Sequence, residues 1–213
     1  GEAAQLNRSR LYGNKPWQWW VRGATEVQQH LAEQCGWREQ RRLQHLALNV
    51  TAGAPSICGG DRLATRAFRP ETDSGDLLRI NNAAFDWHPD QNNWTTDDLE
   101  RALAQSWVRF EHILVCEDAG QMTGFCWMKF HQSDVRTGEI FLIAIDPARS
   151  HERIGQRLAC TALTSMVEEG AERAELWCEA DNQPALNLYD RLGFSVVATD
   201  VAYAPPQEFE ATA

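Results

Sequence analysis

A glutamate inside an otherwise apolar run is the first residue with a chemistry of its own. The segment GEIFLIAID (138–146) carries Glu139 near its start. An apolar strand disfavours the charged form of a carboxylate, and this makes the group a better general base near neutral pH. The alternative is a strand-end Glu139 that faces solvent and does no chemistry.

The segment IDPARSHERIGQRLAC (145–160) raises the question of an anion site. It predicts a strand that breaks at Pro147, a short charged loop and the start of a helix. Backbone N–H groups at a helix N-terminus can bind phosphate, and glycines let the backbone come close. Gly155 is the sole glycine of this loop, so the segment by itself is too weak a signal to name a phosphate site.

Periodicity and turn residues predict the elements that must position these groups. The strands are expected at 62–68, 112–118, 122–131, 138–146, 174–181 and 194–204, and the helices at 73–85, 95–107, 154–170 and 183–193. This order indicates one mixed, mainly antiparallel sheet flanked by helices, an α/β (α+β) class, rather than a series of βαβ units.

Two of the predicted helices carry clear local signals. The helix after the charged loop has a core-facing stripe at steps of four residues and stops at Gly170. Thr95 is followed three residues later by Asp98, a weak relative of the capping box. The stripe consists of Ile154, Leu158, Ala162 and Met166.

Composition restricts the class of partner and the compartment. The 213 residues carry a net charge of -10, which makes nucleic acid and anionic membranes poor partners. The six cysteines show neither CxxC spacing nor the density of a disulfide scaffold, so we expect small buried thiols and a reducing cytoplasm. We find no membrane span or signal peptide, and a start at Gly1 suggests that the natural N-terminus is missing.

An ungapped internal similarity bears on the number of domains. Residues 20–37 align with residues 177–194, and each segment predicts a strand end, a helix, a glycine and a strand. Chance similarity is the alternative. We predict that residues 1–50 close a first domain, that 51–61 form a linker and that 62–213 form the catalytic domain. The aligned pairs include Trp20 with Trp177, Leu31 with Leu188, Gly36 with Gly193, and Trp37 with Phe194.

The second half of the chain resembles the GNAT acyltransferase superfamily. The pattern is an apolar strand, IDP, a loop, an amphipathic helix and then N...A..LY..LGF. Its matching positions are Pro147, Gly155, Asn182, Ala185, Tyr189, Gly193 and Phe194. The resemblance implies the GNAT fold and an acyl-CoA donor.

Longer segments are similar to the C-terminal half of the mycothiol synthase family. They are RINNAAFDWHPDQNNWT, GFCWMKFH, GEIFLIAIDP and DNQPALNLYDRLGF. The resemblance implies two tandem GNAT domains, the first mostly missing here. It also implies acetyl transfer from acetyl-CoA to the cysteinyl amine of a cysteine-glucosamine-inositol conjugate. We expect a monomer that needs no metal.

The same resemblance assigns two catalytic roles. Glu139 matches the family's general base, which acts through water and also touches the substrate amine. Tyr189 matches the general acid, which protonates the departing thiolate. The alternative for Tyr189 is a core aromatic beside Leu186 and Leu192.

Three stretches match the family's coenzyme contacts. A strand edge is expected to pair its backbone with the pantetheine arm, a loop to hold the pyrophosphate, and a helix start to add further contacts. Asn182 and Pro184 also fit an ordinary helix cap. The residues are Ile143, Ala144 and Ile145; Ser150, His151, Glu152, Arg153, Ile154, Gly155 and Gln156; and Asn182, Gln183, Pro184, Ala185, Leu186 and Asn187.

The loop departs from the superfamily pattern [QR]xxGx[GA]. Ser150 replaces the leading Gln or Arg, Arg153 replaces the first glycine, and Glu152 adds a negative charge. We expect that Arg153 needs no positive φ, so that its N–H still faces an anion. Coenzyme binding should then be weakened but retained, with help from the guanidinium.

The family's acceptor contacts fall on Asp90, Lys129, Glu139 and Trp177. Lys129 fits an outward strand residue equally well. His131, Trp94 and Trp127 also match the family, but we expect core or turn roles for them. Because the family has Glu at position 90 and Tyr at position 177, two alternatives stay open: a different acceptor amine, or a non-catalytic acyl-CoA-binding fragment.

Overall fold

The periodic segments of the sequence form eight strands and five α-helices in the part of the chain that the structure describes. The computed structural model describes residues 18–59, 63–88, 91, 93–131 and 135–206. The strands are β1 (Trp19–Val21), β2 (Arg38–Asn49), β3 (Thr65–Ala67), β4 (Ile113–Asp118), β5 (Gln121–His131), β6 (Thr137–Ile145), β7 (Arg173–Glu179) and β8 (Ser195–Ala204). The α-helices are α1 (Glu26–Gln34), α2 (Pro70–Ala84), α3 (Thr96–Leu103), α4 (Ile154–Glu168) and α5 (Gln183–Arg191), and the short 3-10 helices are η2 (Ser56–Cys58), η3 (Phe110–His112) and η4 (Pro147–Glu152).

The strands are hydrogen-bonded in the order β1-β8-β2-β7-β6-β5-β4-β3. β6 and β7 run parallel, whereas the β1–β8, β2–β8, β3–β4, β4–β5 and β5–β6 pairs are antiparallel. The predicted α/β class with a mixed, mainly antiparallel sheet is therefore confirmed.

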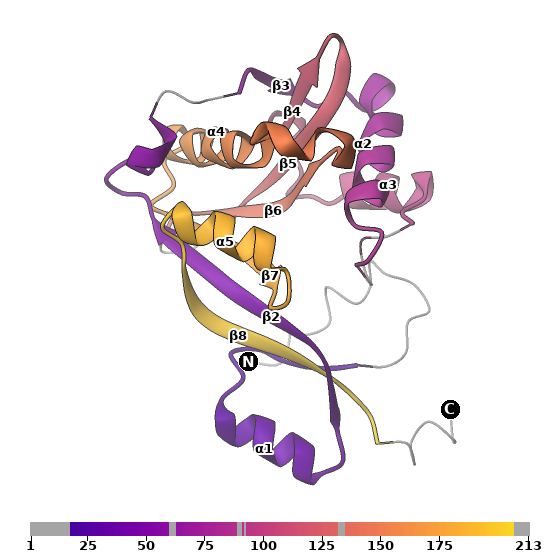
Figure 1. The fold of residues 1–213 in the computed structure, drawn as a ribbon, viewed down its shortest axis with the longest axis vertical. Helices are drawn as coiled ribbons and strands as arrows, with labels where there is room; N and C mark the ends of the chain where they lie inside the picture. The colour runs from indigo at the N-terminus through magenta and orange to yellow at the C-terminus, as the bar shows by residue number, and fades with distance from the viewer. Residues whose placement is uncertain (1–17, 60–62, 89–90, 92, 132–134, 207–213) are drawn as a thin grey trace. The chain divides into compact units, whose positions relative to one another are not determined.

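One compact unit comprises residues 48–175. In it α4 lies against β5 and β6 (Figure 1). The four stripe residues predicted for α4 are 5% exposed or less. A Cβ atom on Gly138 of β6 would lie 2.7 Å from Cγ of Met166, so α4 can pack this closely only against a glycine. The helix is followed by Gly170 at φ 81°, as predicted.

The other compact unit consists of residues up to 47 together with 176–213, of which 18–47 and 176–206 are described. Here β8 is paired with β1 on one edge and β2 on the other. Its core includes Val21, Ala32, Val201 and Tyr203.

Both segments of the predicted repeat have the same local structure. The order strand, α-helix, glycine and strand occurs in β1-α1-β2 and again in β7-α5-β8 (Figure 1). Gly36 and Gly193 have φ values of 76° and 89° after their helices, a conformation that glycine adopts without strain. The common origin of the two segments and the predicted division into domains stay predictions.

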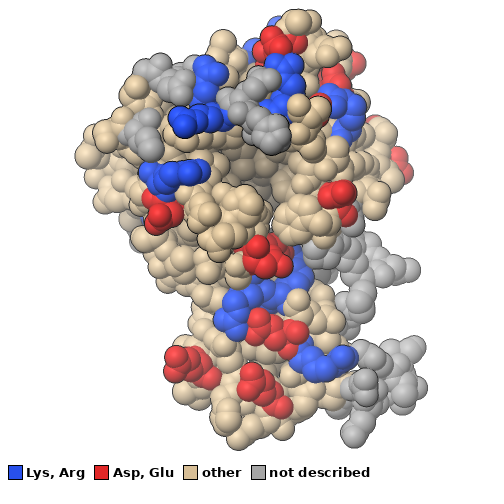
Figure 2. All heavy atoms as spheres, in the orientation of Figure 1, with Lys and Arg blue, Asp and Glu red and all other residues tan. Residues whose placement is uncertain are grey.

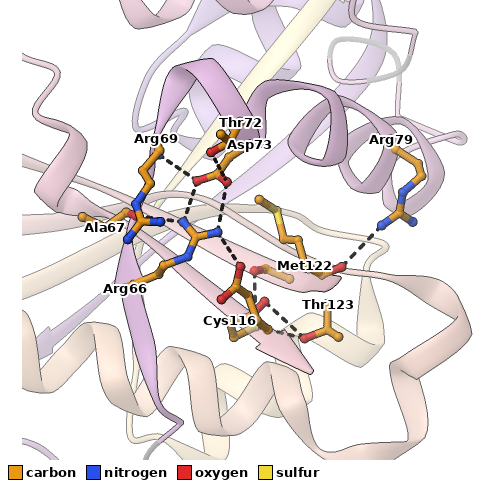
Figure 3. A network of polar contacts seen from close by, with 11 residues as sticks. Arg66, Ala67, Arg69, Thr72, Asp73, Arg79, Cys116, Met122 and Thr123 are labelled. Carbon is orange, nitrogen blue, oxygen red and sulfur yellow. Dashed lines mark hydrogen bonds and ion pairs between the residues drawn. The ribbon is translucent and has the colours of Figure 1, made fainter. Parts of the chain in front are cut away.

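An arginine–aspartate pair joins β3 to α2 (Figure 3). Arg66 donates to both carboxylate oxygens of Asp73, at 2.6 and 3.0 Å, and to Glu117 on β4 at 2.5 Å. The backbone N–H of Arg69 also donates to Asp73 at 2.7 Å. Asp73 thus ties the N-cap residue of α2 to the first turn, where Arg69 has no capping side chain.

A disulfide joins Cys58 of η2 to Cys160 of α4, with 5.2 Å between the Cα atoms. The expectation of thiols throughout is wrong for this pair. The backbone N–H of Leu63 also donates to Thr161 Oγ1 at 3.1 Å, and η2, which belongs to the predicted linker, contacts α4. The two cysteines are 102 residues apart, and no spacing rule reveals such a contact. The other cysteines, Cys35, Cys116, Cys126 and Cys178, are free, and the last three are buried.

The surface mixes both signs of charge. On the face shown in Figure 2, basic side chains lie beside acidic ones in several places. None of the helices in the described ranges is long and apolar enough to cross a membrane.

Candidate active site

Glu139 lies on β6 with its carboxylate shielded from water. Its side chain is 3% exposed, so a solvent-facing glutamate is excluded. Gly138 faces α4, and since successive strand residues point to opposite faces, Glu139 points away from that helix. Its register partner on the antiparallel strand β5 is Lys129.

The carboxylate of Glu139 meets His131, the last residue of β5. Oε2 of Glu139 lies 2.7 Å from Nε2 of His131, whose side chain is 31% exposed. An ionised carboxylate can only accept, so a tautomer of His131 with its proton on Nε2 would be the donor to it. The sequence leads us to expect a core or turn role for His131, and that expectation does not include a contact with Glu139. Because His131 is two residues beyond Lys129, the strand period places both on one face, but the pairing with Glu139 depends on the hairpin register.

Lys129 shares this face with an aromatic group. Its Nζ lies 5.0 Å from the ring centroid of Trp107, which follows α3. Trp107 in turn meets Phe141 at 5.0 Å and Trp127 at 5.9 Å between centroids. Lys129 is partly buried, and its acceptor role stays a prediction. A cation held against an aromatic ring beside a carboxylate suits a polar, partly charged ligand.

In the second half of β6, the edge that faces β7 lies beyond the described pairing of these two strands. β6 and β7 pair only over Thr137–Glu139, with Glu139 opposite Glu175. The β5 ladder continues to Ile145 and shifts register beside Phe141. The predicted coenzyme residues Ile143, Ala144 and Ile145 are in this continuation. A strand edge of this kind can pair its backbone with an extended ligand.

The charged loop is the 3-10 helix η4 followed by Arg153 and α4. Asp146 caps η4 by accepting the backbone N–H of Ala148 at 3.0 Å. Its other oxygen accepts from Arg79 of α2 at 2.5 Å, and this hydrogen bond lowers the pKa of Asp146. The first N–H groups of a helix have no partner within it, so the start of α4 offers donors to an anion.

Arg153 corrects one expectation about this loop. It is the N-cap of α4 with φ 53° and ψ 20°, which is the left-handed conformation. The expectation that this position needs no positive φ is therefore wrong. A side chain costs roughly 1–2 kcal/mol there, whereas glycine does not. The superfamily pattern has a glycine here because glycine adopts the left-handed conformation without strain. Arg153 adopts the same conformation with a strained backbone, and its side chain is exposed.

The third predicted coenzyme stretch is the start of α5. Asn182 Oδ1 accepts from the backbone N–H of Ala185 at 3.3 Å, and Pro184 is in the first turn. The helix-cap interpretation is confirmed, and the coenzyme role stays a prediction. Tyr189 on the same helix is 6% exposed and meets Phe194 edge-on at 5.8 Å.

Of the predicted acceptor contacts Asp90 and Trp177, the structure describes only Trp177. Asp90 lies outside the described residues. Trp177 stacks on His45 with centroids 4.1 Å apart and donates from Nε1 to Asp200 at 3.2 Å. The indole therefore has structural contacts of its own, and its acceptor role stays a prediction.

Comparison with known proteins decides the family. The description "Acetyltransferase (GNAT) family" matches residues 78–194, more than half of the chain. The chain belongs to the GNAT acetyltransferase family. A solved structure agrees on the fold: the GCN5-related N-acetyltransferase from Sphaerobacter thermophilus has a TM-score of 0.69 at 21% identity, and the match covers 87% of this chain and 58% of that one.

Curated relatives point to one branch of the GNAT family. The mycothiol acetyltransferase of Mycobacteroides abscessus is 36% identical over 186 residues, which is 86% of this chain and 62% of the relative. That of Gordonia bronchialis is 33% identical over 213 residues, which is 97% of this chain and 66% of the relative. The chain thus spans a little under two thirds of the length of these relatives.

Proposed function

We propose that the chain is an acetyl-CoA-dependent N-acetyltransferase whose acceptor is the cysteinyl amine of a cysteine-glucosamine-inositol conjugate, as in mycothiol biosynthesis. One observation carries the proposal: the buried carboxylate of Glu139, on β6 of a GNAT sheet, contacts His131 of β5, and Glu139 is the register partner of Lys129 on β5. The names of the curated relatives support the acceptor class.

The described backbone suits the donor in two places. The β6 edge over Ile143–Ile145 would pair with an extended amide chain, and the start of α4 would hold phosphate. Ser150–Gln156 and Asn182–Asn187 complete the proposed coenzyme contacts. Acetyl-CoA would supply the thioester, whose acetyl group is transferred.

Glu139 is the proposed general base. An ammonium must lose a proton before its nitrogen can attack a thioester, and a carboxylate can accept that proton. Tyr189 is the proposed general acid, because a phenol can return a proton to a departing thiolate. Their roles rest on the family resemblance and on the burial of both side chains.

Lys129 and Glu139 are the proposed acceptor contacts on β5 and β6, with Asp90 and Trp177 as further contacts. A polyhydroxylated acceptor with an ammonium group matches this mixture of charge and aromatic surface. The rest of the proposal is less specific to the site. We infer a cytoplasmic monomer, in keeping with the three buried free cysteines, and a segment 1–50 that closes a first GNAT-like domain.

Two measurements test the function. Acetyl-CoA titrated into the chain should bind, and the absence of heat at millimolar coenzyme would exclude catalysis by this chain. Release of free CoA should then be faster with the cysteine-glucosamine-inositol conjugate than with simple amines. Equal rates across the panel would reject the proposed acceptor.

Site variants test the assigned roles. Glu139→Gln and Tyr189→Phe should each lower kcat by about 100-fold or more, since general acid–base groups contribute 10²–10⁴. Glu169→Gln is the matched control, because Glu169 is an exposed carboxylate at the end of α4. Unchanged turnover in both site variants would refute the mechanism.

A further inference from the structure

The contact between His131 and Glu139 has no part in the roles assigned so far. It joins the end of β5 to the first part of β6, with 2.7 Å between Nε2 and Oε2. Glu139 is buried, while the ring of His131 is about one third exposed. This hydrogen bond therefore connects the shielded carboxylate to a side chain that reaches the surface.

A buried carboxylate needs donors, because losing its hydration without replacement is costly. The strand register supplies one here. His131 is opposite Thr137, and Glu139 is two residues further along β6 on the same face. The diagonal reach from β5 to β6 is typical of long side chains in antiparallel pairs.

The other charged groups near Glu139 have contacts of their own. Lys129, its register partner, has its ammonium over the ring of Trp107. Glu175, its partner on β7, lies 3.7 Å from the guanidinium of Arg173. His131, in contrast, contacts a carboxylate oxygen of Glu139 at hydrogen-bond distance.

We propose that His131 is a positioning residue for the general base. Its Nε2–H fixes Oε2 of Glu139, and because a carboxylate is planar, this sets the direction in which Oε1 points. The base is then held ready to take one proton from the acceptor ammonium. His131 itself neither gains nor loses a proton in this step. The inference rests on the proposed function of Glu139.

The test compares two replacements of His131 in the full chain. His131→Phe keeps a ring but removes the donor, whereas His131→Gln keeps an N–H at about the position of Nε2. His131→Phe should lower kcat by about 10- to 100-fold, the range for losing a hydrogen bond to a charged group. The KM for acetyl-CoA should stay nearly unchanged, and His131→Gln should recover most of kcat.

The control is His112→Phe, since His112 packs on Phe130 and makes no contact that the mechanism uses. It should turn over at the wild-type rate. If His131→Phe is too unstable to assay, His131→Ala with added imidazole replaces it, and recovery of kcat by imidazole is expected.

The outcomes separate the two hypotheses. An active wild type with a slow Glu139→Gln variant and a fast His131→Phe variant overturns the positioning role alone. A rate loss in His131→Phe that His131→Gln or imidazole fails to restore also overturns it, because the ring is then needed for packing. A wild type that transfers no acetyl group to any amine overturns the proposed function, and the role of His131 with it.

Discussion

Arg79 of α2 donates from Nη1 to Oδ2 of Asp146, at 2.5 Å, at the point where β6 passes into η4. The same guanidinium donates to the backbone oxygen of Met122 on β5 at 3.3 Å (Figure 3). Asp146 also accepts from the backbone N–H of Ala148. One side chain of α2 thus holds the start of the proposed coenzyme loop against the sheet.

Replacing Arg79 with Leu should weaken acetyl-CoA binding several-fold. The loop would lose the contact that fixes Asp146, and ordering it would then cost conformational entropy on binding. Calorimetric titration measures the change. The control is Arg101→Leu, which removes an exposed i,i+3 pair with Asp98 on α3. Equal affinities for Arg79→Leu and the wild type would show that the loop is held by other means.

Arg153→Gly should stabilise the fold by about 1 kcal/mol. The change removes the strain of a side chain in the left-handed conformation. Part of this gain in stability is lost, because glycine gives the unfolded chain more conformational entropy. Arg153→Ala keeps the Cβ atom and removes the guanidinium, so it should gain nothing. The free energy of unfolding in urea distinguishes them. Equal stability of the Gly and Ala variants would mean that the backbone at this position is not strained.

Asp73 should make stability depend on pH below neutrality. Burial alone would raise its pKa, but hydrogen bonds from Arg66, from the N–H of Arg69 and from Thr72 outweigh burial, and the pKa is lowered. A carboxylate with a lowered pKa stabilises the fold above its unfolded pKa of about 3.9, and this contribution is lost as pH falls through the folded value.

Asp73→Asn should therefore cost about 2 kcal/mol at pH 7 and less near pH 2, where the wild type has lost the same contribution. Urea unfolding at several pH values measures both. The control is Asp76→Asn, because Asp76 is 46% exposed and pairs with Arg79 only at the surface. A cost for Asp73→Asn that is the same at every pH would contradict the assignment.

Local patterns predicted most of the elements. The stripe on α4, the stop at Gly170 and the capping box of Thr95 with Asp98 all occur in the structure. These features depend on residues three or four apart, whose spacing fixes their geometry. The helix predicted from residue 73 begins at Pro70, since proline suits a first helical turn.

Local patterns of this kind could not predict the features of the candidate site that depend on residues far apart in the sequence. Glu139 could be chosen because a carboxylate in an apolar strand is unusual, and its burial is confirmed. Its partner His131 depends on the register of the β5–β6 hairpin. The φ of Arg153 depends on how η4 joins α4, which residue types alone do not show. Composition likewise says nothing of which cysteines meet across 102 residues.

The disulfide between Cys58 and Cys160 leads to a prediction about stability. Reduction should lower the free energy of unfolding by about 2–4 kcal/mol, because the bond closes a long loop and restricts the unfolded chain. Urea unfolding with and without dithiothreitol measures the loss. Cys58→Ser should reproduce it and be insensitive to dithiothreitol, whereas Cys35→Ser, at an exposed free cysteine, should behave as the wild type. If dithiothreitol leaves the wild-type midpoint unchanged, the two sulfurs are thiols in solution.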